Sequence, residues 1–245
     1  MDLTAQICSA LQTQSFPTPS VLWATTLTSR IPTPPLPSLI ATAKARLLAA
    51  DLTTAGLLEP SSTASLPTTS PETPEAVLQH DVPCQVLDVE NLSLSRWEQV
   101  EELEAVARGE QTTGRRVVRL AATEETEYDN IDESSAPGAA GRGGTTTPQM
   151  QQQRRNTTHR LVLQDYKGQK VYAIELQRVE KIGIGSTNIG EKIMLKKGTV
   201  IARGTVLLEP NKCILLGGRI DPWQKAWVEG RMERLKEAVQ SGREQ

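Results

Sequence analysis

The sequence predicts an α+β protein in which a unit of three short helices precedes a small β-barrel that ends in a helix. Three observations lead to this fold class. In the first 51 residues, apolar side chains recur every three or four positions, which is the period of a buried helical face. Between residues 192 and 218, short apolar runs alternate with Gly, Pro, Asn and charged residues, as strands and turns do. A Gly-Gly pair and a Pro-Trp step then introduce a last helix.

The N-terminal helical unit is expected within residues 1–58. Its helices are expected over residues 2–14, 19–30 and 36–51, and the second of them opens on Thr18-Pro19, a favourable N-cap and first-turn pair. So few residues make a minimal bundle that needs another surface to pack on. The apolar positions of the three helices are Leu3, Ile7, Leu11, Val21, Leu22, Trp23, Leu27, Leu36, Leu39, Ile40, Ala43, Leu47 and Leu48.

Residues 59–80 are rich in Pro, Ser and Thr and show no apolar period, so a linker is expected there. The barrel is expected over residues 81–240. Its first strand should run over residues 82–89. A helix should follow over residues 95–108, with its glutamates facing solvent.

The end of the barrel is expected to be a hairpin over residues 204–218, closed at Glu209-Pro210-Asn211. Trp223 and Trp227 follow four residues apart, which places both indoles on one face of the closing helix. Such spacing is more typical of a helix that docks onto its own barrel than of a platform for stacked bases.

Three phrases carry a resemblance to a known family. They are GTVLLEPNKCILLGGRID at residues 204–221, RLVLQDY with VYAIEL at residues 160–176, and VPCQVLDV at residues 82–89. In this order they resemble the RecQ-mediated genome instability family. The resemblance implies a five-stranded OB-fold barrel with a helical unit packed on it, and the short chain resembles the fungal type of this family.

A long segment, residues 109–156, separates the expected first helix of the barrel from its next strand. A compact barrel needs no such connection, and the segment passes from RRVVRL through an acidic run to a Gly-, Thr- and Gln-rich stretch. The resemblance implies an insertion here that reaches the gate of topoisomerase III. A mobile, inert tether remains the alternative. The expected partner-binding residues of the insertion are Arg115, Val117, Val118, Leu120 and Tyr128.

Composition excludes several classes of protein. The net charge of −2 argues against a protein that coats nucleic acid by charge alone, although residues 154–245 hold 18 basic and 10 acidic groups. Three distant cysteines make neither a disulfide framework nor a cysteine-rich metal site. No apolar stretch is long enough to span a membrane, and the N-terminus has no basic region typical of a signal peptide.

No catalytic or metal-binding pattern is found, so a non-enzyme without cofactor or metal is expected. The glycines at 183, 185 and 190 miss the dinucleotide-binding spacing, because Asn188 stands at the third glycine position. His80 and His159 are far from one another and from any cysteine pair.

The leading hypothesis rests on the resemblance. It implies a nuclear subunit that binds topoisomerase III and, with a RecQ-family helicase, promotes dissolution of double Holliday junctions, touching DNA mainly through the complex. A second partner-binding surface is expected on the last hairpin, at Leu208, Glu209, Asn211 and Lys212. The alternative is a barrel that binds single-stranded nucleic acid by stacking and charge. Its expected contacts are Tyr166, Tyr172, Lys196, Lys197 and Arg203.

Overall fold

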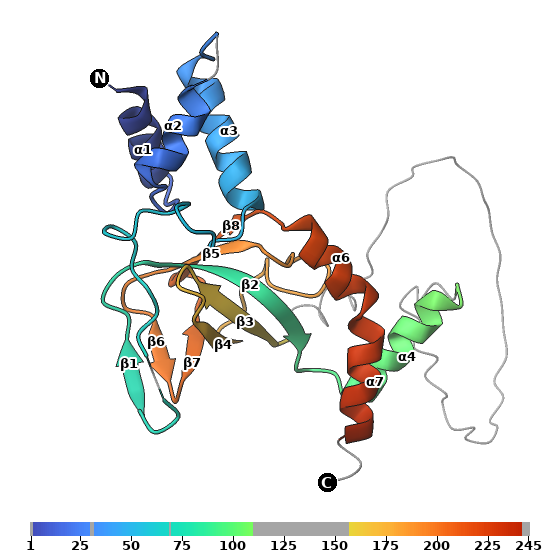
Figure 1. Ribbon diagram of the computed structural model, residues 1–245. Helices are drawn as coiled ribbons and strands as arrows, with labels where there is room; N and C mark the ends of the chain where they lie inside the picture. The colour runs from blue at the N-terminus through green and yellow to red at the C-terminus, as the bar shows by residue number, and fades with distance from the viewer. Residues whose placement is uncertain (1, 30–31, 69, 110–156, 242–245) are drawn as a thin grey trace, which may run out of the picture.

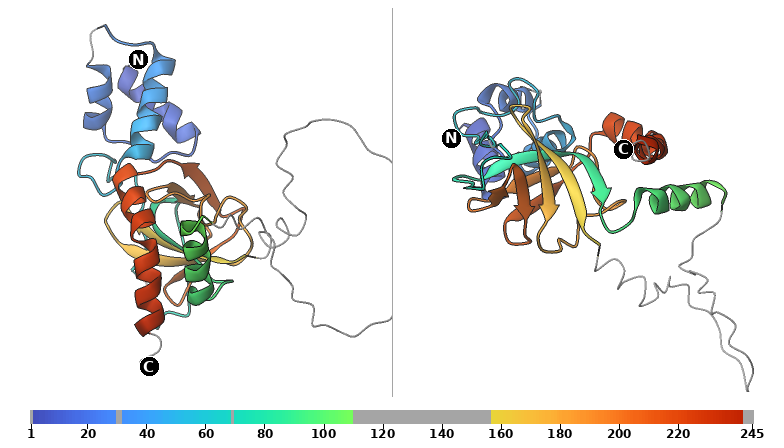
Figure 2. Two further views of the ribbon diagram at one scale, coloured as in Figure 1. Left: turned by 90° about the vertical axis from the view of Figure 1, so that its right-hand side faces the viewer. Right: turned by 90° about the horizontal axis from the view of Figure 1, so that it is seen from below.

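The computed structural model describes residues 2–29, 32–68, 70–109 and 157–241 (Figure 1). A helical unit lies over one end of a curved sheet, and further helices lie along the side of that sheet (Figures 1 and 2). Within these residues, no helix is long and apolar enough to cross a bilayer.

The helical unit consists of α1 (Leu3–Thr13), α2 (Val21–Thr28) and α3 (Leu36–Ala49). Asp2 caps α1 by accepting the Thr4 N–H, and Ser20 caps α2 by accepting the Trp23 N–H. The expected start of α2 at Thr18-Pro19 is therefore two residues early, because Pro19 forms an isolated β-bridge with Leu58. The small core of the unit contains Ile7, Leu11, Leu27, Leu39 and Ala43.

The first residues of α2 do not join that core. Val21 and Leu22 are exposed, Leu22 by 81%, whereas their neighbour Ala24 is fully buried. Only one stripe of an eight-residue helix can face α1 and α3, so the consecutive apolar residues that the sequence shows there cannot all be buried.

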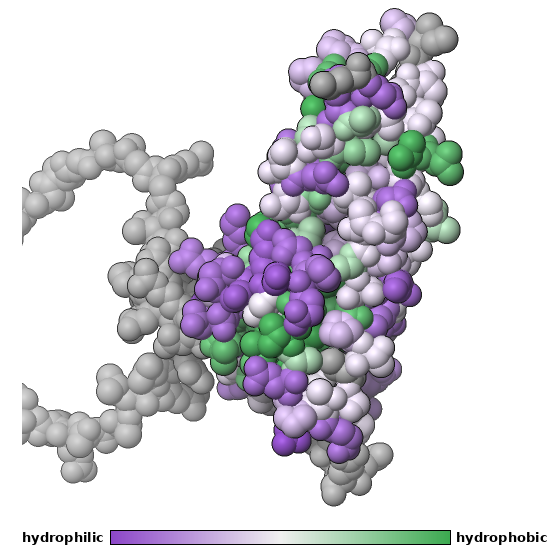
Figure 3. Space-filling model, turned by 90° about the vertical axis from the view of Figure 1, so that its left-hand side faces the viewer, coloured by the Kyte–Doolittle hydropathy of each residue, from purple (hydrophilic) through white to green (hydrophobic). Residues whose placement is uncertain are grey.

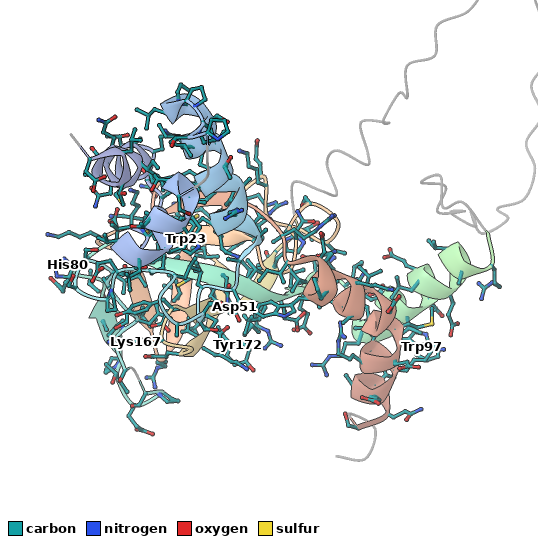
Figure 4. The ribbon with its side chains drawn as sticks, turned by 45° about the horizontal axis from the view of Figure 1, so that its top comes forward. Trp23, Asp51, His80, Trp97, Lys167 and Tyr172 are labelled. Carbon is teal, nitrogen blue, oxygen red and sulfur yellow. The ribbon has the colours of Figure 1, made fainter. Side chains whose placement is uncertain are left out.

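A second apolar cluster joins the helical unit to the sheet. Leu47, Leu52, Leu57 and Leu58 are buried together, and Tyr166 from the sheet packs against them. Polar contacts reinforce this junction, because the Gln85 side chain accepts the Leu52 N–H at 3.0 Å and donates to Asp51 at 2.6 Å. Figure 4 shows Asp51 between the helical unit and the sheet.

The segment expected as a linker packs on the sheet. Leu66 is buried in the core, and its N–H donates to the Asp165 carboxylate at 2.9 Å. Gln169 donates to the Pro67 carbonyl at 2.9 Å, and further along the segment Glu75–Val77 forms an edge strand. Residues 59–80 therefore extend the packing of the barrel.

Eight described strands form one sheet in the order β1-β6-β7-β4-β3-β2-β5-β8, where five were expected. The expected strands over residues 160–176 are confirmed as the antiparallel pair β3 and β4. The strands are β1 (Glu75–Val77), β2 (Val82–Asn91), β3 (His159–Asp165), β4 (Lys170–Glu175), β5 (Lys192–Leu195), β6 (Val200–Ala202), β7 (Thr205–Leu208) and β8 (Cys213–Gly217).

The expected hairpin over residues 204–218 is wrong. β7 pairs with β6 and, in parallel, with β4, whereas β8 pairs with β5 at the far end of the strand order. The turn at residues 209–212 thus connects β7 to β8, two strands that lie far apart in the strand order. The physical reason lies in the strand edges: β7 covers the edge of β4 and β8 covers the edge of β5, which would otherwise both be free.

Inside the curve, the inward side chains of all these strands form the main core. Trp223 and Trp227 of α6 (Asp221–Glu229) pack against this core, so the expected docking of the closing helix is confirmed. A further helix, α7 (Arg231–Ser241), continues the chain. It lies beside α4 (Arg96–Ala107), to which the Lys236–Glu104 ion pair of 2.7 Å connects it (Figure 2).

Candidate partner-binding face

The sequence-predicted insertion residues Arg115, Val117, Val118, Leu120 and Tyr128 lie outside the described residues. The barrel residues that precede α4 (Arg96–Ala107) and follow the insertion are described. The Leu92 N–H donates to the Thr158 carbonyl at 2.9 Å, and the Thr158 N–H donates to Ser93 Oγ at 2.9 Å. The chain therefore leaves and re-enters the barrel at two points that are hydrogen-bonded to one another.

The four residues predicted for partner binding on the last hairpin differ in their exposure. Leu208 is fully buried because it occupies an inward position of β7, so it cannot contact a partner. The Glu209 carbonyl accepts hydrogen bonds from the Lys212 N–H and from Cys213 Sγ, which closes the turn. Of the four predicted residues, only Asn211 is exposed, whereas Glu209 and Lys212 are half-buried.

The five residues predicted for nucleic acid lie in separate places. Tyr172 is 53% exposed on β4, whereas Tyr166 packs against the junction cluster. Lys196 and Lys197 both contact Asp81 at the far end of β5, and Arg203 lies in the turn between β6 and β7. Because β5 is separated from β4 by two strands, these residues do not line one groove.

The register of the sheet brings a different set of side chains together. Along β3, β4 and β7, burial alternates, so that every second side chain points away from the core. Three cross-strand pairs on the outward side are apolar. They are Val77 with Val200, Ile174 with Leu207, and Val162 with Tyr172.

Leu176 directly follows β4, continues its alternation at an outward position, and is 58% exposed. We call the surface formed by Val77, Val162, Tyr172, Ile174, Leu176, Val200 and Leu207 the outer face. The outward side of such a sheet is normally polar, so an apolar row across β1, β6, β7, β4 and β3 is unusual. Figure 3 shows hydrophobic residues gathered on the barrel below the helical unit, with hydrophilic residues around them.

Charged side chains hold one border of the outer face in place. The Arg160 guanidinium lies 4.9 Å from the centre of the Tyr172 ring and is hydrogen-bonded to Glu90. Glu90 also pairs with Arg96 at 3.7 Å. One ordered aromatic ring within an aliphatic row suits an apolar protein surface better than a series of stacked bases.

A buried polar cluster fixes the start of β3, directly after the insertion. Glu175 Oε2 accepts the His159 N–H at 2.8 Å and contacts His159 Nδ1 at 2.9 Å, while Oε1 accepts from Arg178 and from the Val179 N–H. Although burial raises the pKa of Glu175, the hydrogen bonds from His159, Val179 and Arg178 lower it below its ordinary value.

No local sequence pattern indicates this cluster, because Glu175 and Arg178 look like ordinary polar residues at the end of a strand. His159 and Arg178 also line a pocket of about 540 Å³ together with the loop at residues 183–186. Within the described ranges, no group of three or more His, Cys, Asp or Glu side chains could hold a metal ion.

Comparisons with known proteins agree with the division of the chain. A family model described as "RMI1, N-terminal OB-fold domain" matches residues 59–231, and one described as "RMI1, N-terminal helical domain" matches residues 11–55. RecQ-mediated genome instability protein 1 of Schizosaccharomyces pombe is 28% identical over 156 residues, which span 62% of this chain and 62% of that protein. The expected OB-fold is confirmed, and its domain includes the segment that the sequence suggested was a linker.

Proposed function

Because this chain belongs to the RMI1 family, we propose that it is a non-catalytic subunit that binds topoisomerase III and works with a RecQ-family helicase in maintaining genome stability. Within such a complex it promotes decatenation and the dissolution of double Holliday junctions. The proposal includes a nuclear location, and contact with DNA mainly through the complex.

The outer face is the observation that carries this proposal. Six apolar side chains form cross-strand pairs on the outward side of the barrel and Leu176 follows them on the same chain, with Tyr172 and Leu176 both more than half exposed. Burying such a row against another protein removes apolar surface from water, at about 25 cal/mol per Å². We therefore assign the docking of topoisomerase III to the outer face and no longer to the turn at residues 209–212.

The insertion at residues 110–156 supplies the regulatory part of the proposal. The barrel residues that precede α4 and follow the insertion are tied to each other by the hydrogen bonds of Leu92, Ser93 and Thr158, so α4 and the insertion together start from a fixed point on the barrel. An insertion that touches the topoisomerase gate in one state more than in the other shifts the balance between these states. Arg115, Val117, Val118, Leu120 and Tyr128 are the residues proposed for that contact.

Two variants test the docking surface. Leu176→Asp places a charge on the outer face, and Leu22→Asp places the same charge on an exposed leucine of α2, outside that face. We expect Leu176→Asp to weaken binding to purified topoisomerase III at least tenfold and Leu22→Asp to leave it unchanged. Equal binding by both variants would refute docking through the outer face.

The insertion needs a separate test. Deletion of residues 112–153 should leave binding to topoisomerase III measurable while it changes decatenation and the kinetics of the gate. Unchanged decatenation with intact binding would show that the insertion is an inert tether.

The alternative function, binding of single-stranded nucleic acid, is favoured by one observation. Tyr172 is exposed on β4, and Arg160 of the neighbouring β3 lies against its ring, on strands of the kind with which OB-folds bind oligonucleotides. This function predicts submicromolar binding of an oligonucleotide with a steep dependence on salt. Weak oligonucleotide binding together with tight topoisomerase binding would reject it.

A further inference from the structure

A surface turn at residues 70–73 precedes the edge strand β1. The Thr73 N–H donates to the Ser70 carbonyl at 3.0 Å, and Pro71 occupies the second position of this turn, where its fixed φ is favourable. Ser70 Oγ accepts the Glu72 N–H at 3.2 Å, so the hydroxyl group keeps its own hydrogen for donation. Ser70 and Pro71 are both exposed.

This turn lies against the turn between β6 and β7. The Arg203 N–H donates to the Pro74 carbonyl at 3.3 Å. A Cβ atom added to Gly204 would lie 3.8 Å from both the Ser70 carbonyl carbon and the Pro71 nitrogen. Ser70 and Arg203 therefore belong to two neighbouring surface turns, with room for little more than a methyl group between Gly204 and the first of them.

Arg203 is an exposed cation with a constrained backbone. Its φ is +47°, a left-handed conformation that few residues other than glycine adopt, so the turn sets the direction of its side chain. In the part of the chain that the structure describes, its guanidinium forms no ion pair, although Glu75 of β1 lies opposite the preceding residue, Ala202. A group with greater negative charge at Ser70 could engage it.

The other Ser/Thr-Pro steps in the described ranges are less suited to modification. Thr18 is half-buried, accepts a hydrogen bond from Gln12 at 2.8 Å and precedes a buried proline. Thr73 is half-buried within the turn itself. Thr33 is exposed and is the natural competitor.

We propose that Ser70 is a phosphorylation site for a proline-directed protein kinase and that Arg203 binds the resulting phosphate. In the reaction, Ser70 Oγ attacks the γ-phosphorus of ATP, and the bond between that phosphorus and the β–γ bridging oxygen breaks. ADP leaves, and the hydroxyl proton passes to the catalytic base of the kinase. Pro71 suits such a kinase because a prolyl nitrogen carries no hydrogen that would need a partner in the kinase groove.

The phosphate changes the edge of the sheet. It brings a charge of about −2 and three acceptor oxygens to a guanidinium that follows β6, the strand that pairs with β1. This pairing ties the turn at residues 70–73 more firmly to β6 and so lowers the frequency with which β1 opens. Val77 of the outer face lies on that strand. The inference does not depend on the proposed function, since it concerns the state of β1 alone.

The first test is the site of modification. The full chain is incubated with ATP and a proline-directed cyclin-dependent kinase, and phosphate is located by mass spectrometry. We expect one phosphate on Ser70, its loss in both Ser70→Ala and Pro71→Ala, and its retention in Arg203→Gln. Incorporation confined to Thr33, or none, would overturn the proposal.

The second test is the role of Arg203. Amide hydrogen exchange over residues 70–78 should slow about two- to fivefold on phosphorylation, as a surface ion pair of ordinary strength would produce. Arg203→Gln should abolish this slowing, whereas Lys197→Gln, which removes an exposed cation elsewhere, should retain it. Equal slowing in Arg203→Gln and the unchanged chain would refute Arg203 as the phosphate-binding residue.

Discussion

The indole Nε1 of Trp227 donates a hydrogen bond of 2.6 Å to Asp88 Oδ1, which links the closing helix α6 to the bulge of β2. Asp88 lies where the register of β2 against β3 shifts, between Val86 and Asp88. The bulge turns this carboxylate toward α6, so that an apolar helix face gains one polar contact of defined geometry.

Trp227→Phe should therefore destabilise the protein by about 1.5–3 kcal/mol, because it removes a hydrogen bond to a charged group and leaves most of the ring packing in place. The matched control is Trp223→Phe, since Trp223 packs on the same core. Urea unfolding followed by circular dichroism measures both variants. A larger loss in Trp223→Phe than in Trp227→Phe would contradict the importance of the Asp88 contact.

Lys192 predicts an unusual dependence of stability on pH. It is almost completely buried, and burial lowers its pKa to about 8, against a smaller opposing effect of Asp51. Below pH 8 the lysine is charged in both states, so the desolvation penalty is fully present. As the pH rises from about 8 to 10.5, the folded state loses this proton first and the penalty disappears.

We expect Lys192→Met to stabilise the protein at pH 7 and to reduce the gain in stability between pH 8 and 10.5. The difference is on the order of 3 kcal/mol at most. The raised pKa values of the Cys84 and Cys213 thiols act in the opposite direction, but they are common to both proteins and cancel in the comparison. Unfolding free energies at pH 7, 8.5 and 10 measure the effect. Parallel pH profiles would refute it.

The two tyrosines of the β3–β4 hairpin region should separate binding from stability. Tyr172→Ala removes an exposed ring of the outer face, so affinity for topoisomerase III should fall about tenfold while the unfolding free energy changes little. Tyr166→Ala removes a ring that packs against Leu47, Leu52 and their neighbours, so it should lower stability by about 2–4 kcal/mol. Titration and chemical unfolding of both variants give the two readouts, and the reverse assignment would contradict the outer face.

Part of this architecture follows from local sequence, and that part was predictable. The α4 helix begins where Ser95 and Glu98 form a reciprocal capping box, a signal spanning four residues. The β3–β4 pair follows from clean alternation on both sides of a turn at Gly168.

The remainder depends on pairings between distant segments, which no local pattern encodes. The choice of β4 over β8 as the partner of β7 joins segments far apart in the sequence and leaves β8 to cover the edge of β5. The outer face appears only when Ile174 lies opposite Leu207, 33 positions further along the chain. Sequence alone therefore located the β3–β4 strands but could not show which side chains the distant pairings bring onto one face.

Glu175 should be a sensitive point of stability, although no catalytic role is assigned to it. Glu175→Gln keeps the shape but leaves the buried His159 ring and the Arg178 guanidinium without their charged acceptor, so a loss of about 3–5 kcal/mol is expected. The lowered pKa of Glu175 means that its contribution is complete above about pH 4.5 and declines as the pH falls below that value. Glu180→Gln, an exposed neighbour, should change stability by less than about 0.5 kcal/mol. Similar losses in both variants would contradict this account.

The adjacent glycines at the end of β8 give the sharpest test of how the helical unit meets the barrel. Both have positive φ, +84° at Gly217 and +94° at Gly218. A Cβ at Gly217 would meet no atom within 4 Å, whereas a Cβ at Gly218 would lie 2.5 Å from the Leu48 carbonyl oxygen of α3. Gly217→Ala should therefore cost about 1 kcal/mol from backbone conformation alone. Gly218→Ala adds a steric conflict with α3 that only a shift of the helical unit relieves, so it should destabilise the protein further and accelerate amide exchange around Leu47 and Leu52. Equal unfolding free energies for the two variants would show that α3 does not press on the end of β8.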